Sequence, residues 1–410
     1  MLLKIIFKNL IHKPLATTLS VSLLALSTGI ISLLLVMQHQ LEQKFERDLR
    51  NIDLVVGAKG SPLQLVLSAV YHVDAPTGNI PLAEVEKLKQ MRSIAQVIPL
   101  AYGDSYQRFR ILGTDTAYIG KYDGRLNNGR LFEKKMEVVL GAAVASNTGL
   151  QVGQRFYGTH GEAEEGEQHH EAEYVVVGVL EPSNTVLDNL LLTPISSVWG
   201  VHEHVETAPE TDHDHGGHDH DHDHEAVDTM PHEVTAALIK ARSTMAVMTL
   251  PRMLNETTNL QATIPALEIN RLMKLLGIGV ATLQALAVGI MLISGFSVFI
   301  ALYNRLRERK YELALMRSLG CGRFRLFGML LMEGLLLALA GFLRGLGLSR
   351  SAIWLLNNSA AQDFHFILRY DLISNEAWLL AVTLLVGMLA AFFPAVKAFR
   401  MNLSTALADA

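Results

Sequence analysis

Residues 275–302 read LLGIGVATLQALAVGIMLISGFSVFIAL and contain no charged side chain. A helix of about 20 apolar residues is long enough to cross a hydrocarbon core of about 30 Å. This stretch exceeds that length, and three others meet or approach it, at residues 16–37, 326–343 and 378–393. The sequence therefore predicts an integral membrane protein with four membrane-spanning helices.

The order of these stretches predicts the domain organisation. One lies near the N-terminus, about 230 mostly hydrophilic residues follow it, and three lie close together at the end. We expect residues 14–37 to form the first span, residues 38–271 a large domain outside the bilayer, and residues 272–410 the other three spans. A basic start can also mark a signal peptide, but this apolar run is too long for one and no clear small-residue cleavage site follows.

Basic residues predict the orientation of the chain. Residues 1–13, the loop 305–325 and the tail after Phe393 hold 12 of the 35 lysines and arginines but only three acidic residues. Segments rich in lysine and arginine stay in the cytoplasm. We therefore expect both termini in the cytoplasm and the large domain outside the cell membrane, which is the periplasm if the cell is Gram-negative. Residues 1–13 mix apolar and basic positions, which predicts an amphipathic helix at the inner membrane surface.

The large domain has the pattern of a mixed α/β fold. Short β-type runs, such as residues 174–180 and 234–239, alternate with helical stretches at residues 82–91 and 243–258. The single cysteine of the chain, Cys321, lies outside the domain, so we expect no disulfide within it.

A histidine-rich insertion at residues 201–232 interrupts this domain. It holds nine of the 16 histidines, and its centre, residues 212–225, reads DHDHGGHDHDHDHE. Imidazoles at alternate positions suit Zn²⁺ or another divalent transition metal. The candidate ligands are His213, His215, His218, His220, His222 and His224. Two interpretations stay open: a physiological metal-handling segment, or a solvated acidic linker whose metal affinity is incidental. The spans hold no cluster of histidine, cysteine or aspartate that would pass a metal ion along.

The loop 305–325 is a candidate docking element. If it is helical, Tyr311, Leu315 and Leu319 lie on one face, and Gly320 can end the helix. The spacing alone leaves two interpretations equally open. The loop is either an ordinary positively charged cytoplasmic connection or a short docking helix for a cytoplasmic partner protein.

A resemblance to a known family favours the second interpretation. The residues that carry it are Arg309, Glu312, Arg317, Ser318, Leu319 and Gly320, with Glu333 in the next helix. Residues 7–10 (FKNL), 176–180 (VVGVL) and Pro394 with Ala395 also fit. Together with the order of spans, these residues resemble the MacB/FtsX-type ABC transporter permeases. The chain departs from the family at Leu403, where proline is usual, and in its histidine-rich insertion.

The resemblance implies a two-component machine. In this family two permease copies pair with two copies of a separate ATPase, and the loop between the second and third spans docks on it. It follows that Arg309, Glu312, Arg317 and Gly320 are the candidate coupling residues. Residues 57–60 (GAKG) lack the spacing of a phosphate-binding loop, so we expect no ATP hydrolysis by this chain itself.

Small and charged residues in the spans have structural interpretations. Gly277, Ala281, Ala285 and Gly289 recur every four residues, which favours a helix-packing face and a dimer contact, although glycine and alanine are common in membrane helices. We expect Glu333 to pair with a basic residue of the loop, and Arg344 and Arg350 to reach outward to the interface.

The resemblance thus implies a homodimeric permease subunit of a bacterial inner membrane that couples a cytoplasmic ATPase to movement of its periplasmic domain. Its expected surroundings are the lipid bilayer and a periplasmic protein or substrate, with no nucleic acid and no required cofactor. Two alternatives are a subunit of a lipoprotein-releasing or envelope-remodelling complex, and a membrane-anchored metal sensor without a transport role.

Overall fold

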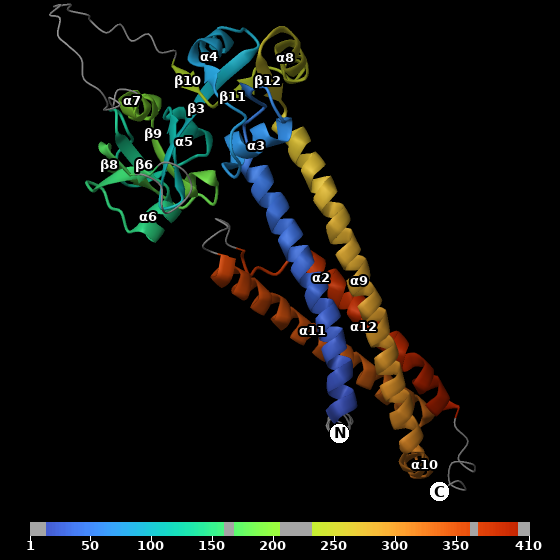
Figure 1. Cartoon of the computed structure of the whole chain (residues 1–410). Coiled ribbons are helices and arrows are strands. Elements are labelled where there is room, and N and C mark those ends of the chain that lie inside the picture. The colour runs from blue at the N-terminus through green and yellow to red at the C-terminus, as the bar shows by residue number, and fades with distance from the viewer. Residues whose placement is uncertain (1–13, 160–167, 206–231, 361–367, 401–410) are drawn as a thin grey trace, which may run out of the picture. The chain divides into compact units, whose positions relative to one another are not determined.

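The computed structural model describes residues 14–159, 168–205, 232–360 and 368–400 (Figure 1). The chain divides into two compact units. One is the helical unit, made of Met1–Glu42 and Lys274–Ala410, and the other is the α/β domain, Gln43–Met273. Each unit is described by itself below.

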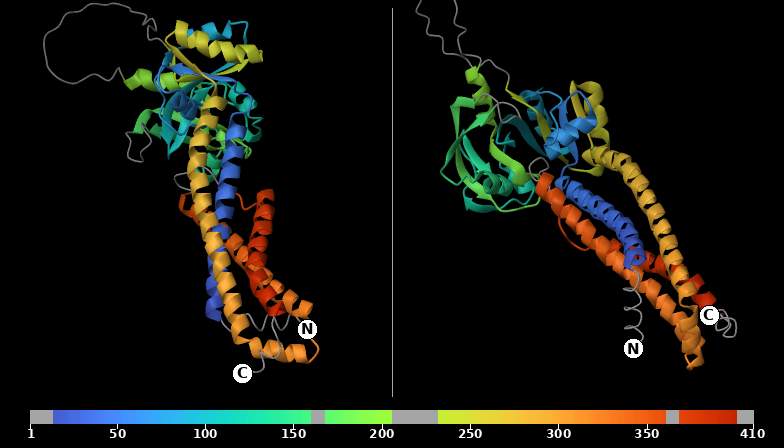
Figure 2. Two further views of the ribbon diagram at one scale, coloured as in Figure 1. Left: turned by 90° about the vertical axis from the view of Figure 1, so that its right-hand side faces the viewer. Right: turned by 60° about the horizontal axis from the view of Figure 1, so that its bottom comes forward.

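Four helices are long and apolar enough to cross a membrane, as the sequence predicts. They are α2 (Pro14–Asp48), α9 (Pro265–Glu308), α11 (Arg323–Ala360) and α12 (Ser374–Phe399). The first two have 35 and 44 residues, which is more than a core of about 30 Å requires. The short helix α10 (Lys310–Ser318) lies crosswise at the end of α9, as Figure 2 shows. The chain is therefore a multi-pass membrane protein.

Glycines let α2 approach α11 closely. A Cβ atom at Gly345 of α11 would stand 2.0 Å from the Thr28 Oγ1 and 2.8 Å from the Ala25 carbonyl oxygen, both on α2. A Cβ at Gly341, one turn earlier, would stand 2.6 Å from Leu24 Cβ. Because lipid tails are as apolar as leucine, such close packing of backbones drives helix association in a membrane. The crossing therefore depends on these two glycines.

A second close crossing joins α11 to α12. A Cβ atom at Gly334 would stand 2.8 Å from the Gly387 carbonyl oxygen, and one at Gly387 would stand 2.9 Å from the Gly334 carbonyl oxygen. Ala338 and Ala391 fill the space beside them. Helix α11 thus presents small residues to two neighbours.

The α/β domain is built on a mostly antiparallel sheet. In the described residues ten strands pair in the order β12-β1-β11-β3-β4-β9-β6-β8-β5, with β7 paired to β3 and β8, while β10 and β2 form a separate ribbon. Two pairings are parallel, β4 with β9 and β6 with β8. The strands are β1 (Leu54–Ala58), β2 (Ile80–Pro81), β3 (Ile94–Tyr106), β4 (Phe109–Thr114), β5 (Leu126–Gly129), β6 (Glu137–Leu140), β7 (Arg155–Thr159), β8 (Gln168–Leu180), β9 (Leu190–Pro194), β10 (Glu233–Val234), β11 (Ala236–Ala241) and β12 (Leu260–Thr263).

Helices cover both faces of this sheet. Successive side chains of a strand point to opposite faces, so Val55 of β1 joins one hydrophobic cluster while Leu54 and Val56 join another. The first cluster includes residues of α3 (Pro62–Tyr71) and α5 (Ala117–Lys121), and the second includes residues of α4 (Leu82–Lys89) and α8 (Thr244–Thr257). The remaining helices are α6 (Ala142–Thr148) and α7 (Ile195–Val205). The fold is mixed α/β, as predicted.

The described residues on either side of the 206–231 gap lie close together. On α7, the Trp199 Nε1 donates a hydrogen bond of 2.6 Å to the carbonyl oxygen of Glu233, in β10. The Trp199 ring also contacts the His232 ring, with 4.2 Å between centroids. This contact therefore joins α7 to β10.

A half-buried histidine joins two tyrosines in the core of the α/β domain. His72 caps α3 with φ 56°, and its Nδ1 and Nε2 lie 2.9 Å and 2.7 Å from the hydroxyls of Tyr102 and Tyr118. The Tyr102 hydroxyl donates to the Ser68 carbonyl, so the Nδ1 must donate to Tyr102 and the Nε2 accept from Tyr118. Burial, and then the positive charges of Arg110 and Lys121, lower the pKa of His72 to about 3. The imidazole is therefore neutral.

Replacing His72 by asparagine, which tolerates a positive φ, should change the acid sensitivity of the domain. At pH 7.5 the variant should lose about 2 kcal/mol of unfolding free energy, because buried tyrosine hydroxyls lose a partner. The folded pKa of about 3 lies below the ordinary 6.5, so the unfolded chain binds the proton first as the pH falls, and wild-type stability drops below pH 6.5. Unfolding in detergent should show the difference between the two proteins shrink by about 2 kcal/mol between pH 7.5 and 5. A constant difference would contradict a neutral His72 with a lowered pKa.

The packing of α11 can be tested with two glycines on the same helix. Gly345→Val should lower the unfolding temperature of the detergent-solubilised protein strongly, because the side chain would displace α2. Gly347→Val is the matched control, since a Cβ there meets no described atom within 4 Å. We expect a loss of about 3 kcal/mol or more for the first variant, as for an overpacked core, and little for the second. Equal losses would show that the α2–α11 crossing is not close.

Candidate functional site

Helix α10 forms the loop between the second and third spans. The N–H of Gly320 donates to the Arg317 carbonyl at 3.1 Å, and the N–H of Cys321 donates to the Met316 carbonyl at 3.0 Å. These two bonds, with φ of +95° at Gly320, form a Schellman motif. The left-handed backbone favours glycine at this position. Gly320 therefore ends the helix, as the sequence predicts, and turns the chain toward α11.

The two faces of α10 differ sharply. Leu313 and Ala314 are buried, and Leu313 packs in a cluster that includes residues of α9, α11 and α12. On the opposite side Tyr311, Leu315 and Leu319 are 51%, 46% and 80% exposed. Their four-residue spacing places them on one face, as predicted. Helix α10 is thus anchored by one side while it presents three large apolar side chains on the other.

The charged residues proposed for coupling lie on α10 or at its ends. Arg309 precedes the helix, and its Nε lies 3.7 Å from the Glu312 Oε2, whose side chain is 68% exposed. An exposed pair of this kind contributes little stability. Arg317 lies half-buried in the last turn. The structure therefore brings Arg309 and Glu312 together, while Arg317 and Gly320 lie at the far end of the helix.

A buried ion pair lies one turn before α10. The Arg305 Nη1 on α9 is 2.5 Å from the Glu333 Oε1 on α11, and both side chains are under 10% exposed. The Arg305 Nη2 also donates to the hydroxyl of Thr17 on α2. Buried charges are stable only when paired and hydrogen-bonded. This pair joins three helices, and it bears out the prediction that Glu333 pairs with a basic residue of the loop.

The sequence did not predict a second buried ion pair. The Arg350 Nη2 on α11 donates to the Glu376 Oε2 on α12 at 2.7 Å. The Ser32 hydroxyl on α2 donates to the other carboxylate oxygen of Glu376, Oε1, at 2.6 Å. The expectation that Arg350 reaches outward is therefore wrong, because Glu376 lies within reach across the helix interface. Arg344 is exposed. The one available signal was Glu376 itself, an acidic residue at the start of an apolar helix.

The small-residue stripe on α9 has no partner in the described part of the chain. Ala281 and Ala285 are exposed, and a Cβ at Gly277 or Gly289 would meet no described atom within 4 Å. The close helix contacts lie instead on α11, at the crossings described above. The packing role of the α9 stripe stays a prediction.

Several predicted features lie outside the described residues. These are the amphipathic helix 1–13, Leu403, and the six candidate metal ligands His213, His215, His218, His220, His222 and His224. Among the described residues no group of three or more histidine, cysteine, aspartate or glutamate side chains could hold a metal ion. The metal hypothesis therefore stays untested.

Comparison with known proteins identifies both parts of the chain. Residues 17–244 match the family model of the MacB-like periplasmic core domain, and residues 285–403 match that of the FtsX-like permease C-terminal domain. No curated protein gives a match.

Two solved structures are similar. One is the periplasmic region of MacB from Actinobacillus actinomycetemcomitans, at 14% identity over 57% of this chain and 98% of that one, with a TM-score of 0.36. The other is the extracellular domain of the noncanonic ABC-type transporter YknZ from Gram-positive bacteria, at 12% identity over 51% and 98%, with a TM-score of 0.31. The first family model alone covers more than half of the 410 residues. The chain therefore belongs to the MacB/FtsX-type family of ABC transporter permeases.

Proposed function

We propose that this protein is the membrane subunit of an ABC transporter or mechanotransmission complex in a bacterial inner membrane. Two copies would pair with two copies of a separate cytoplasmic ATPase, which performs the ATP hydrolysis. The observation that carries the proposal is the exposed apolar face of α10, made of Tyr311, Leu315 and Leu319. The excess of basic residues in and around α10 supports a cytoplasmic position for this face.

The composition of this face suits a protein partner. Three large apolar side chains side by side in water are unfavourable unless a partner covers them, and burying each one contributes about 1.5–3 kcal/mol. Glu312 lies beside them and can add a charged contact at the rim of the interface. Docking of an ATPase would therefore exclude water from the apolar residues first.

The anchoring of α10 supports transmission of movement into the spans. Leu313 packs in one cluster with Leu306 of α9, Leu326 of α11 and Ala395 of α12. The Arg305–Glu333 pair, one turn away, adds α2 to the same group. A displacement of α10 by the ATPase would move the ends of several helices together instead of bending a loose loop.

Two continuous helices connect this group to the α/β domain. Helix α2 begins in the helical unit and ends in the α/β domain, and α9 runs in the opposite sense. In the topology that the basic residues predict, the α/β domain lies in the periplasm. Movement imposed on the cytoplasmic ends of these helices would then act on the periplasmic domain, where a substrate or partner protein is engaged.

Two parts of the proposal rest on the sequence. The α9 stripe of Gly277, Ala281, Ala285 and Gly289 is exposed or half-exposed in one copy, which suits a contact between two copies in the membrane. The histidine-rich insertion suggests a link to Zn²⁺ or a similar ion. Co-purification with the ATPase, with and without Zn²⁺, addresses both the assembly and the metal link.

The docking face can be tested by charge insertion. Leu315→Asp should weaken co-purification with the ATPase about ten- to hundredfold, since one leucine contact contributes about 1.5–3 kcal/mol. The double variant Glu312→Ala/Arg317→Ala should assemble but lose stimulated ATP hydrolysis in nanodiscs. Lys310→Ala, which removes an exposed charge from another side of α10, is the control and should behave as wild type. Unchanged assembly of Leu315→Asp would refute the docking face.

The buried pair can be tested by comparing a single variant with a double variant. Glu333→Leu alone should lower the unfolding free energy by about 3–5 kcal/mol, because Arg305 would be left buried without its partner. The double variant Arg305→Met/Glu333→Leu should recover most of that loss, because both charges are removed. Thermal unfolding in detergent measures both effects. A double variant as unstable as the single one would argue against a direct pair.

A further inference from the structure

Helices α9 and α12 place aromatic and then basic side chains next to each other near their C-terminal ends. On α9, Phe299, Tyr303 and Arg307 recur every four residues, and on α12 Phe393 is followed by Lys397 at the same spacing. Residues four apart lie on the same face of a helix. Each helix therefore carries one column of side chains that runs from apolar to basic.

Contacts between the two helices join these columns in pairs. The centroids of the Phe299 and Phe393 rings are 5.9 Å apart. Four residues further along each helix, the Lys397 Nζ donates a hydrogen bond of 2.5 Å to the Tyr303 hydroxyl and lies 4.4 Å from the centre of the Tyr303 ring. At a rise of 1.5 Å per residue, the aromatic pair and the polar pair are about 6 Å apart along the helix axes. The two columns thus form one continuous α9–α12 face.

This face is open on its outer side. Phe393 is 61% exposed, Arg307 and Lys397 are exposed as well, and Phe299 and Tyr303 are half-buried. Phe393 belongs to the apolar stretch of a helix long enough to cross a membrane. An apolar surface continues into a basic one here, as the interior of a bilayer continues into its headgroup region.

The basic end of the face is not neutralised by the described part of the chain. Among those residues, neither Arg307 nor Lys397 pairs with an acidic side chain; the partner of Lys397 is the neutral Tyr303 hydroxyl. That hydroxyl accepts from Lys397 and keeps its own hydrogen to donate. The face therefore offers two positive charges and several hydrogen-bond donors.

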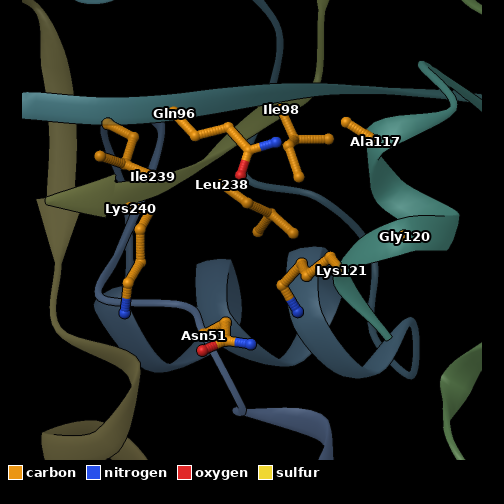
Figure 3. A pocket seen from close by; sticks show the side chains of 9 residues that line it. All are labelled: Asn51, Gln96, Ile98, Ala117, Gly120, Lys121, Leu238, Ile239 and Lys240. Carbon is orange, nitrogen blue, oxygen red and sulfur yellow. The ribbon is translucent and has the colours of Figure 1, made fainter. Parts of the chain in front are cut away.

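The lysines beside the cavity of the α/β domain are engaged differently (Figure 3). The Lys240 Nζ lies 3.1 Å from the Asp53 Oδ1. The Lys121 Nζ is buried, 3.6 Å from the centre of the Tyr122 ring. The first charge is already balanced and the second is out of reach, so neither lysine matches the exposed, unbalanced pair on the α9–α12 face.

We propose that the α9–α12 face binds an anionic phospholipid. The phosphate accepts hydrogen bonds from Lys397, Arg307 and the Tyr303 hydroxyl. One acyl chain lies along the two phenylalanine rings, deeper in the bilayer. Basic residues between membrane helices and a tyrosine at the interface suit a lipid headgroup, and the fork of an arginine matches a phosphate.

A second copy of this chain fits the face less well. The segments near this end of the spans, 305–325 and the tail after Phe393, carry an excess of basic residues. Another copy would therefore bring positive charge to positive charge, whereas a phosphate brings the opposite sign. The lipid site goes beyond the proposed coupling function and can be tested without the ATPase.

Native mass spectrometry of the full chain in detergent, with phosphatidylglycerol as the probe, tests the site. Phosphatidylglycerol should bind at least about tenfold more tightly than phosphatidylcholine with the same acyl chains, because each basic residue near the phosphate contributes about fivefold. Arg307→Ala/Lys397→Ala should remove this preference, and Lys397→Arg should keep it. No preference in the wild type, or an unchanged preference in the double variant, would overturn the proposal.

Arg325→Ala separates a defined site from general attraction to a basic surface. Arg325 is an exposed residue in the first turn of α11, so its replacement removes the same charge from another helix and should leave the preference unchanged. A loss equal to that of Lys397→Ala would overturn the site. Inorganic phosphate should not displace the lipid, and displacement would show a site for free phosphate instead.

Two further readouts address the acyl chain and the fold. Phe393→Ala should weaken both lipids by the same factor, because their chains are identical; a changed preference would contradict the placement of the chain. Phosphatidylglycerol should raise the unfolding temperature of the wild type but not that of Arg307→Ala/Lys397→Ala, which should unfold like the wild type without lipid. If Lys397→Ala changed the number of chains in the particle and not the number of bound lipids, a second copy would cover the face and the proposal would fail.

Discussion

The helical unit depends on close contact between the backbones of neighbouring helices, at the crossings of α11 with α2 and α12. In lipid there is no hydrophobic force to bring helices together, so van der Waals packing and polar contacts must do so. Helix α11 supplies both. Its glycines let α2 and α12 approach, and two of its charged side chains, Glu333 and Arg350, are neutralised by Arg305 of α9 and Glu376 of α12. Every other span thus contacts α11 through a specific residue.

In this arrangement the ion pairs and glycine crossings lie along α11, and the exposed apolar face lies on α10. The two ion pairs lie toward opposite ends of α11, and the glycine crossings lie between them. Helix α10 is joined to the end that carries Glu333, where its buried side packs and its apolar side does not. The same short helix therefore combines a packed attachment with an exposed apolar surface, which suits the docking role proposed above.

The sequence predicted the features that depend on local composition. Apolar length gave the four spans, and the four-residue spacing with Gly320 gave α10 and its exposed face. It did not predict which residues meet across helices. Small residues occur in several spans, and the stripe chosen on α9 is exposed, while the glycines in contact are on α11. The partner of Arg350 was missed for the same reason, since pairs that are distant in sequence are set by tertiary packing. In the α/β domain, nothing near His72 in sequence indicates Tyr102 or Tyr118, which β3 and α5 bring to it.

The contact of Trp199 with His232 and Glu233 has a consequence for how this protein can change over generations. That contact joins α7 to β10 through residues that lie outside the segment 206–231. A change in the number of residues between them would leave this contact in place, so the position offers a place to graft a reporter domain onto an otherwise intact permease.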